Sequence, residues 1–191
     1  MGNSNKNKML KILQYGSPIL EKPTNKVENV KDPKILKLID EMLKVLEKEE
    51  DHSAGLSAPQ VGQSLKIAIC RRLDLEDELQ DKNKQQNIVK KTEAIWEVMI
   101  NPQITYKSND KSTKWEGCLS VNQGELFGEV TRPRIVKVKY TTIEGKEVEI
   151  IADGYFSHVV QHELDHLDGV LFLKYINDPT KLYTPDEIED L

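Results

Sequence analysis

Several residue types are scarce in this sequence, and each shortage narrows what the chain can be. Two cysteines, Cys70 and Cys118, are too few for a disulfide-stabilised secreted scaffold. No apolar run approaches the roughly 18 residues of a membrane-spanning helix. The start of the chain, Met1 to Lys8, is polar and lacks the apolar centre of a secretion signal. We therefore expect a cytoplasmic protein that makes no membrane contact and keeps its thiols reduced.

Basic residues are not in excess either. Lys and Arg number 27 against 32 Asp and Glu, which gives a net charge of -5, and no basic stripe predicts a specific nucleic-acid surface. Hydrophobic residues make up 38% and charged residues 31%, as in ordinary folded proteins. A chain of this length is expected to form one domain over residues 1–191, with residues 1–8 flexible.

Two segments are expected to be helices. Asp32 and Pro33 predict the start of the first, because aspartate caps a helix and proline suits its first position, and apolar residues then recur every three or four positions. The second helix is expected from Gly154 to Leu167. Asp153 would cap its start, and Gly169 would stop it in a left-handed conformation.

Short runs rich in β-branched residues predict strands at Lys66 to Cys70, Glu97 to Ile104, Leu126 to Val130, Ile135 to Thr142, and Glu147 to Ile151. A turn at Glu144 and Gly145 joins the last two. Leu73 to Lys91 is rich in charged and amide side chains, so residues 74–93 are expected to form a surface insertion whose charges are only solvated. Helices and antiparallel strands in this order predict an α+β fold.

The second helix carries the most informative residues. Gln161 to His166 reads Gln-His-Glu-Leu-Asp-His, and its two histidines lie about 40° apart on one helix face. Both His162 and His166 can therefore reach one ion. Glu163 lies beside that ion, where its carboxylate can take a proton from water. His158 is one turn earlier, about 12 Å along the axis from His166, so we expect it in the pocket wall or the core.

A catalytic ion normally has three protein ligands and one open position. One protease class would supply a third histidine at position 172, but that residue is Phe172. Cys118 is the better candidate, because the preceding Gly117 lets the backbone come close to a bound group. Cys70 ends an apolar run and is expected in the core. If both cysteines were ligands, the site would be a closed, structural Cys2His2 zinc site.

Three segments of the sequence are similar to peptide deformylases, which remove the N-formyl group from new polypeptides. They are Gly55 to Gln60 (Gly-Leu-Ser-Ala-Pro-Gln), Glu116 to Ser120 (Glu-Gly-Cys-Leu-Ser), and Gln161 to His166. Their order and rough spacing also match. The chain resembles this family from about Leu10 to Tyr175, and the three motifs together are highly specific.

The resemblance implies a ferrous ion and three ligands for it, Cys118, His162 and His166. Zinc, nickel and cobalt also suit such ligands and could occupy the site in a purified sample. Glu163 would act as general base and then as general acid. Gln60 and the backbone N–H of Leu119 would complete the site, because attack on the formyl carbonyl builds negative charge on an oxygen that these donors can share.

The resemblance further implies antiparallel sheets around a central metal-bearing helix, together with a substrate pocket. The candidate pocket residues are Ala54, Gly55, Gly117, Arg134, Tyr155, His158 and Val159. For Arg134, a solvated strand position is an equally good explanation. Ser53, Ser57 and His158 depart from the family pattern, which puts the first loop and the shape of the methionine pocket in question.

The implied reaction is hydrolysis of N-formyl-methionyl nascent polypeptides, which frees formate and needs no organic cofactor. It could take place near the ribosome, although the acidic end of the chain, Asp186 to Leu191, offers no obvious grip on RNA. One rival hypothesis is a zinc endopeptidase that uses the same histidines and glutamate with another third ligand. A second rival is a non-catalytic domain with a closed zinc site at Cys70, Cys118, His162 and His166.

Overall fold

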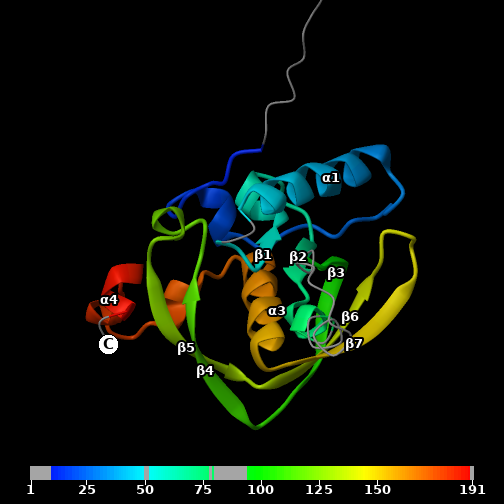
Figure 1. Ribbon diagram of the computed structural model, residues 1–191. Coiled ribbons are helices and arrows are strands. Elements are labelled where there is room, and N and C mark those ends of the chain that lie inside the picture. Colours follow the sequence, from blue (N-terminus) through cyan, green and yellow to red (C-terminus); the bar gives the residue numbers. More distant parts are fainter. Residues whose placement is uncertain (1–9, 50–51, 78, 80–93, 190–191) are drawn as a thin grey trace, which may run out of the picture.

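The computed structural model describes residues 10–49, 52–77, 79 and 94–189. Two antiparallel sheets flank one central helix, α3 (Gly154–Leu167) (Figure 1). The larger sheet has the order β1-β2-β3-β6-β7, with strands at Gly55–Ser57, Ile67–Arg71, Trp96–Lys107, Ile135–Thr141 and Glu147–Asp153. The smaller sheet is a hairpin of β4 (Lys111–Gly117) and β5 (Phe127–Pro133). This arrangement confirms the predicted α+β fold with sheets around the central helix.

Strand β2 is buried on both faces, which explains why its apolar run is uninterrupted. Ile67 and Ile69 pack in the core shared with helix α1 (Pro33–Lys48). Ala68 and Cys70 point to the other side, into the core shared with α3, because successive side chains of a strand face opposite ways. The sheet is therefore held between α1 and α3, which lie on different sides of it (Figure 1).

Helix α1 begins as the sequence predicts. Pro33 occupies the first turn, and the side chain of Asp32 accepts a hydrogen bond from the backbone N–H of Lys34 at 2.8 Å. Its apolar positions form the buried face, which contains Leu38, Ile39, Met42, Val45 and Leu46. This helix contributes packing and no chemistry.

Helix α3 has the predicted bounds, but the capping hydrogen bond expected at its start is absent. Gly169 has φ of +75°, and an added Cβ would lie 2.6 Å from the backbone nitrogen of Lys22. The expectation that Asp153 caps the helix is wrong, since its side chain makes no capping hydrogen bond. The carboxylate instead accepts from Nε of Arg134 at 3.1 Å. The carboxylate that was expected to cap the helix is thus engaged in an ion pair with Arg134.

The predicted strands are present with bounds shifted by a few residues, and Gly145 has the positive φ, +86°, that its predicted turn requires. Two strands were missed. Strand β1 is short, and β4 (Lys-Ser-Thr-Lys-Trp-Glu-Gly) shows no apolar alternation because only Glu116 in it is buried.

The insertion is described only in part, since residue 78 and residues 80–93 lie outside the described residues, as do residues 1–8. The expectation that its charges are only solvated is wrong for Glu76. This side chain is 8% exposed and accepts hydrogen bonds from Arg71 at 2.9 Å and from the backbone N–H of Ile95 at 2.9 Å. The start of the insertion is therefore anchored to the larger sheet.

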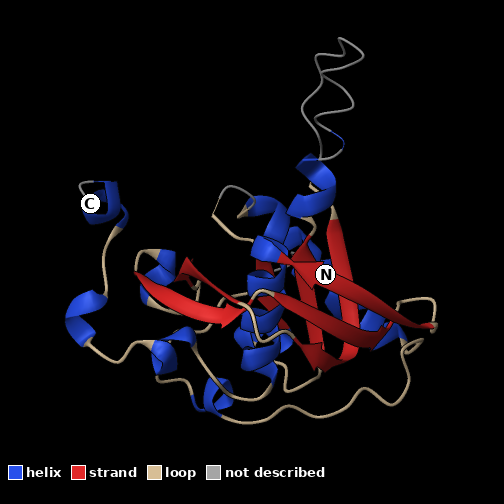
Figure 2. Cartoon of the chain, turned by 90° about the horizontal axis from the view of Figure 1, so that it is seen from below, coloured by secondary structure: helices blue, strands red, loops and turns tan. Residues whose placement is uncertain are grey.

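The remaining elements are short. They are 3-10 turns at Pro18–Glu21, Ala58–Val61, Asn122–Gly124, Phe172–Tyr175 and Pro179–Lys181, and helix α4 at Pro185–Glu189. The C-terminal segment lies on the side of the β4–β5 hairpin, away from the larger sheet, in both views (Figures 1 and 2). Within the described part of the chain, no helix combines the length and apolarity needed to cross a membrane.

Candidate metal centre

Three side chains from two distant segments converge on one point. Cys118 directly follows β4, whereas His162 and His166 lie on adjacent turns of α3. Their ligand atoms all lie within 4.8 Å of one another, and Sγ of Cys118 is 3.2 Å from Nε2 of His166. All three side chains are buried. The predicted ligands are thus brought together, and we call them the metal cluster.

The pKa values of the two histidines of the metal cluster are shifted in opposite directions. Burial alone would lower the pKa of His162, but hydrogen bonds to Cys118 and Glu116 raise it well above its usual value. Burial lowers the pKa of His166, which keeps that imidazole in the neutral form that binds metals. A thiolate with two imidazoles suits a divalent transition metal. The residues present therefore fit the predicted ion.

Glu116 of β4 orients His162 for this purpose. Its buried carboxylate accepts from Nδ1 of His162 at 3.0 Å and from two nitrogens of Arg132 at 2.6 and 2.9 Å. Burial would raise the pKa of Glu116, but hydrogen bonds from His158, His162 and Arg132 hold it well below its usual range. The ionised carboxylate fixes a proton on Nδ1 of His162 and leaves Nε2 free to face the ion.

Arg132 of β5 connects the β4–β5 hairpin to α3 and was not singled out from the sequence. Besides Glu116, it donates to Asp165 of α3 at 2.7 Å, and its guanidinium lies over the ring of Tyr175 at 4.7 Å. The sequence held one signal, because strand alternation puts Arg132 on the same buried face as Val130. A buried arginine needs an acidic partner.

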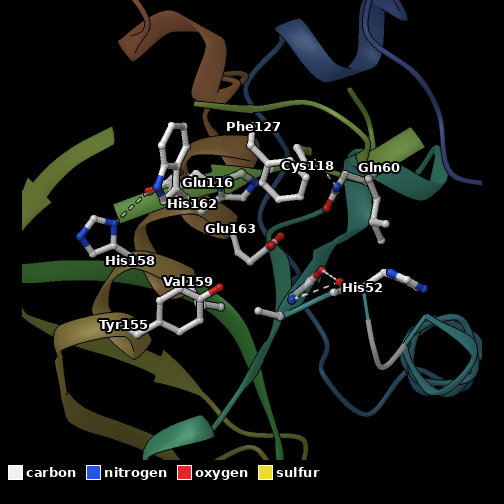
Figure 3. A pocket seen from close by; sticks show the side chains of 17 residues that line it. His52, Gln60, Glu116, Cys118, Phe127, Tyr155, His158, Val159, His162 and Glu163 are labelled. Carbon is white, nitrogen blue, oxygen red and sulfur yellow. Dashed lines mark hydrogen bonds and ion pairs between the residues drawn. The ribbon is translucent and has the colours of Figure 1, made fainter. Parts of the chain in front are cut away.

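Glu163 is held between α3 and β1. Burial raises its pKa to about 7, and its Oε2 has no hydrogen-bond partner among the described residues. Gly55 packs against it so closely that an added Cβ would lie 2.6 Å from Oε1. The close-up shows the carboxylate at the centre of the pocket (Figure 3). Such a group can accept and return a proton near neutral pH.

The amide of Gln60 has a fixed orientation. Its Oε1 accepts from the backbone N–H of Ser57 at 2.8 Å and from the Ser57 hydroxyl at 2.9 Å. The Nε2 group therefore faces the site, where it donates to Oγ of Ser120 at 3.3 Å and to Sγ of Cys118 at 3.6 Å. Ser57 stands where alanine is common in the family that the sequence resembles. Its two hydrogen bonds thus orient the amide of Gln60, the predicted donor.

One pocket is lined by Cys118 and His162 of the metal cluster and by most of the other predicted site residues (Figure 3). Its lining includes Ala54, Gly55, Gln60, Gly117, Cys118, Leu119, Tyr155, His158, Val159, His162 and Glu163. The sequence did not single out Trp115 and Phe127, which also line it. The position of Phe127 explains why residue 117 is glycine, because a Cβ added there would lie 2.5 Å from the Phe127 ring.

Comparison with known proteins identifies the family. The family model of the Polypeptide deformylase matches residues 9–182. The chain belongs to the peptide deformylase family. A peptide deformylase from Desulfotalea psychrophila is 36% identical over 169 residues, 88% of each chain, and peptide deformylase 1 of Bacillus subtilis is 35% identical over 95% of this chain and 96% of its own.

Solved structures agree with this assignment. The crystal structure of a peptide deformylase from Synechococcus elongatus, in complex with actinonin, is similar with a TM-score of 0.75 and 31% identity, covering 92% of this chain and 85% of that one. Peptide deformylases are metal-dependent hydrolases, and the metal cluster supplies a site for the ion.

Two residues that were singled out from the sequence have local partners. Arg134 does not line the pocket. It is about half exposed and pairs with Asp153 at 3.1 Å and Asp110 at 3.7 Å. The hydroxyl of Ser53, a departure from the family pattern, donates to the carbonyl of Gly55 at 2.7 Å and so closes the loop locally.

Cys70 is outside the metal cluster. It is fully buried in the core between β2 and α3, and burial, with Glu163 next, raises the pKa of its thiol well above the usual value. Among the described residues, the group that could hold a metal contains Cys118 and two histidines and leaves Cys70 out. This disfavours the closed Cys2His2 alternative.

Proposed function

We propose that this chain hydrolyses the formyl amide of N-formyl-methionyl polypeptides and releases formate. The observation that carries the proposal is the position of Glu163, a buried carboxylate with a pKa of about 7 that faces the same pocket as the metal cluster. A zinc endopeptidase could use the same helix, but the Cys118 ligand and the family relatives favour deformylation.

The mechanism divides the work among few residues. A divalent ion in the metal cluster would supply Lewis acidity, which activates water and polarises the formyl carbonyl. Glu163 takes a proton from the attacking water. Nε2 of Gln60 and the backbone N–H of Leu119 donate to the carbonyl oxygen as negative charge develops on it. When the C–N bond breaks, Glu163 gives its proton to the leaving nitrogen, so the products are formate and a free amino terminus.

The pocket residues are proposed to hold the first residue of the substrate. They are Ala54, Gly55, Gly117, Tyr155, His158 and Val159, all of which line the cavity beside Glu163. Arg134 is left out because its guanidinium is committed to Asp153 outside that lining. Nascent polypeptides are the proposed partners, which places the enzyme in the cytoplasm near the ribosome. Residues 1–191 are proposed to act as one catalytic domain.

The proposed resident ion is Fe2+. Thiolate and imidazole also accept Zn2+, Ni2+ and Co2+, so a sample purified in air is expected to contain a mixture. Metal analysis of protein purified without oxygen tests this, with formate release measured on the same sample. Fully active protein that contains stoichiometric zinc and no iron would contradict the assignment of iron.

The central test is Glu163→Ala, assayed by formate release from a formyl-Met peptide. Loss of a general acid and base lowers the rate by about 100-fold to 10,000-fold, while metal content stays at one ion per chain because Glu163 is not a ligand. The matched control is Glu147→Ala, at an exposed glutamate of β7 that forms an ion pair with Lys139. An unchanged rate in Glu163→Ala defeats the mechanism.

The rival functions give different results in the same experiments. A zinc endopeptidase would cut unformylated peptide internally. A closed structural site would lose its ion when Cys70 is replaced, so Cys70→Ser is expected to retain metal under the present proposal.

A further inference from the structure

The ring of His158 is fully committed to hydrogen bonds, although it lines the pocket. Its Nδ1 lies 3.0 Å from Oε1 of Glu116, and its Nε2 lies 2.9 Å from Oγ and 3.1 Å from the backbone oxygen of Ser112. The side chain is 1% exposed. Because the ionised carboxylate of Glu116 can only accept, Nδ1 of His158 must donate.

The donors around Glu116 form two matched pairs. Oε1 accepts from Nε of Arg132 and from His158, and Oε2 accepts from the other Arg132 nitrogen and from His162. His158 and His162 are one helical turn apart, so they hold opposite oxygens of one carboxylate from the same side of α3. Without His158, Oε1 keeps only Arg132, and the carboxylate loses one of the contacts that fix its plane.

Ser112 gives His158 an anchor on the hairpin. It lies in β4 directly opposite Arg132 in the strand register, so the position of His158 is set by the same two strands that carry Glu116 and Arg132. Hydrogen bonds therefore run from Ser112 to His158, then to Glu116, and then to the ligand His162. The close-up shows the contact between His158 and Glu116 at the edge of the pocket (Figure 3).

We infer that His158 is a positioning residue for the metal cluster, which by bridging Ser112 and Glu116 holds the carboxylate that orients His162. This inference rests on the metal site of the proposed function and not on the reaction itself. Partners that orient metal ligands typically change metal affinity by about 10-fold to 100-fold when they are lost. The inference extends the sequence expectation, which placed His158 in the pocket wall or the core.

Two substitutions of similar polarity distinguish the roles of the two ring nitrogens of His158. In His158→Asn the amide nitrogen can take the place of Nδ1 and donate to Glu116. In His158→Gln the amide nitrogen of glutamine instead reaches the place of Nε2, near Ser112, so the donor to Glu116 is lost. Each variant is loaded with Co2+ alone, and release to a chelator is followed by loss of the visible absorption of the ion.

The expected result is release about 10-fold faster in His158→Gln and within about 3-fold of the unsubstituted protein in His158→Asn. If His158 only shapes the pocket, both variants release Co2+ at the original rate and only KM for the formyl-Met peptide changes. That result overturns the inference. Cobalt release does not depend on catalysis, so a protein that fails to deformylate can still show the difference between the variants.

A measurement on the unsubstituted protein tests the inference even when the variants do not fold. With Zn2+ bound, long-range proton–nitrogen NMR spectra of His158 are expected to show a proton on Nδ1, shifted downfield by its carboxylate partner. An unprotonated Nδ1 contradicts the inference.

Discussion

At the scale of single residues, Gly55 determines how closely β1 approaches the Glu163 carboxylate. The three atoms nearest to an added Cβ all belong to the Glu163 side chain, at 2.6 to 2.8 Å. Glycine is therefore needed at this position for space, because the carboxylate occupies the place where a side chain would be.

Gly55→Ala is expected to displace the Glu163 carboxylate. Formate release should fall by at least about 10-fold, because a small misplacement of a reacting group is costly, and the free energy of unfolding should fall by about 1–3 kcal/mol from overpacking. Urea unfolding and kcat/KM measure the two effects. In a Glu163→Ala background, which lacks the clashing atoms, Gly55→Ala should cost little stability. Additive losses of stability would contradict the assigned clash.

The sequence singled out the residues that are proposed to carry chemistry, but it did not single out Arg132 and Ser112, which lie around them. Cys118, His162 and Glu163 stand in local motifs whose spacing is readable along one chain. Arg132 and Ser112 matter because strand register places them side by side, and register between two strands is not visible in either strand alone.

At the scale of elements, the end of α3 depends on the backbone conformation of Gly169. Gly169→Ala forces a side chain into φ of +75° and against the backbone of Lys22. Gly16→Ala is the matched control, since Gly16 has φ of +89° but nothing within 4 Å of an added Cβ. The left-handed conformation alone costs about 1–2 kcal/mol, so Gly16→Ala should lose that much and Gly169→Ala clearly more in urea unfolding. Equal losses would show that the Lys22 contact relaxes freely.

Strands β3 and β6 are joined by a hydrogen bond with a pH dependence of its own. The hydroxyl of Tyr140 donates to Glu97 at 2.5 Å, and burial, followed by Glu97, raises the pKa of Tyr140 well above its usual value of about 10. A raised pKa in the folded state means that this stabilisation is complete below the unfolded pKa and is lost as pH rises above about 10.

Tyr140→Phe should therefore lower the free energy of unfolding at pH 7 by about 1.5–3 kcal/mol, as for hydrogen bonds to charged groups. It should also flatten the loss of stability between pH 9 and 11. Urea unfolding at several pH values measures both effects, and Tyr106→Phe, at a half-exposed tyrosine of β3, is the control. An unchanged alkaline loss in Tyr140→Phe would refute the assignment.

Element prediction succeeded where burial leaves a pattern and failed where it does not. Helix α1 and strand β2 carry apolar residues at the spacing that their buried faces require. Strand β4 buries only Glu116 and has the sequence of a polar loop, yet it positions this glutamate in the site. The predicted Asp153 cap is absent because Arg134, 19 positions earlier in the sequence but adjacent in space, pairs with its carboxylate.

At the scale of the whole molecule, an ion bound by the metal cluster would link the β4–β5 hairpin to α3. A ligand that binds only the folded protein stabilises it by about 2.7 kcal/mol when its concentration is 100 times Kd. Removing the ion with a chelator should therefore shift urea unfolding of the native protein to lower concentrations. In Cys118→Ser, whose site lacks the thiolate, added metal should shift the midpoint much less. Equal stability of the loaded and stripped native protein would contradict this role.

Cys118 and His166 are 48 positions apart in the sequence, yet their ligand atoms meet. During synthesis, the cysteine leaves the ribosome well before either histidine does, and no partial chain that stops before α3 can present the full set of donors. Each new copy must therefore complete α3 before its three donors can bind one ion.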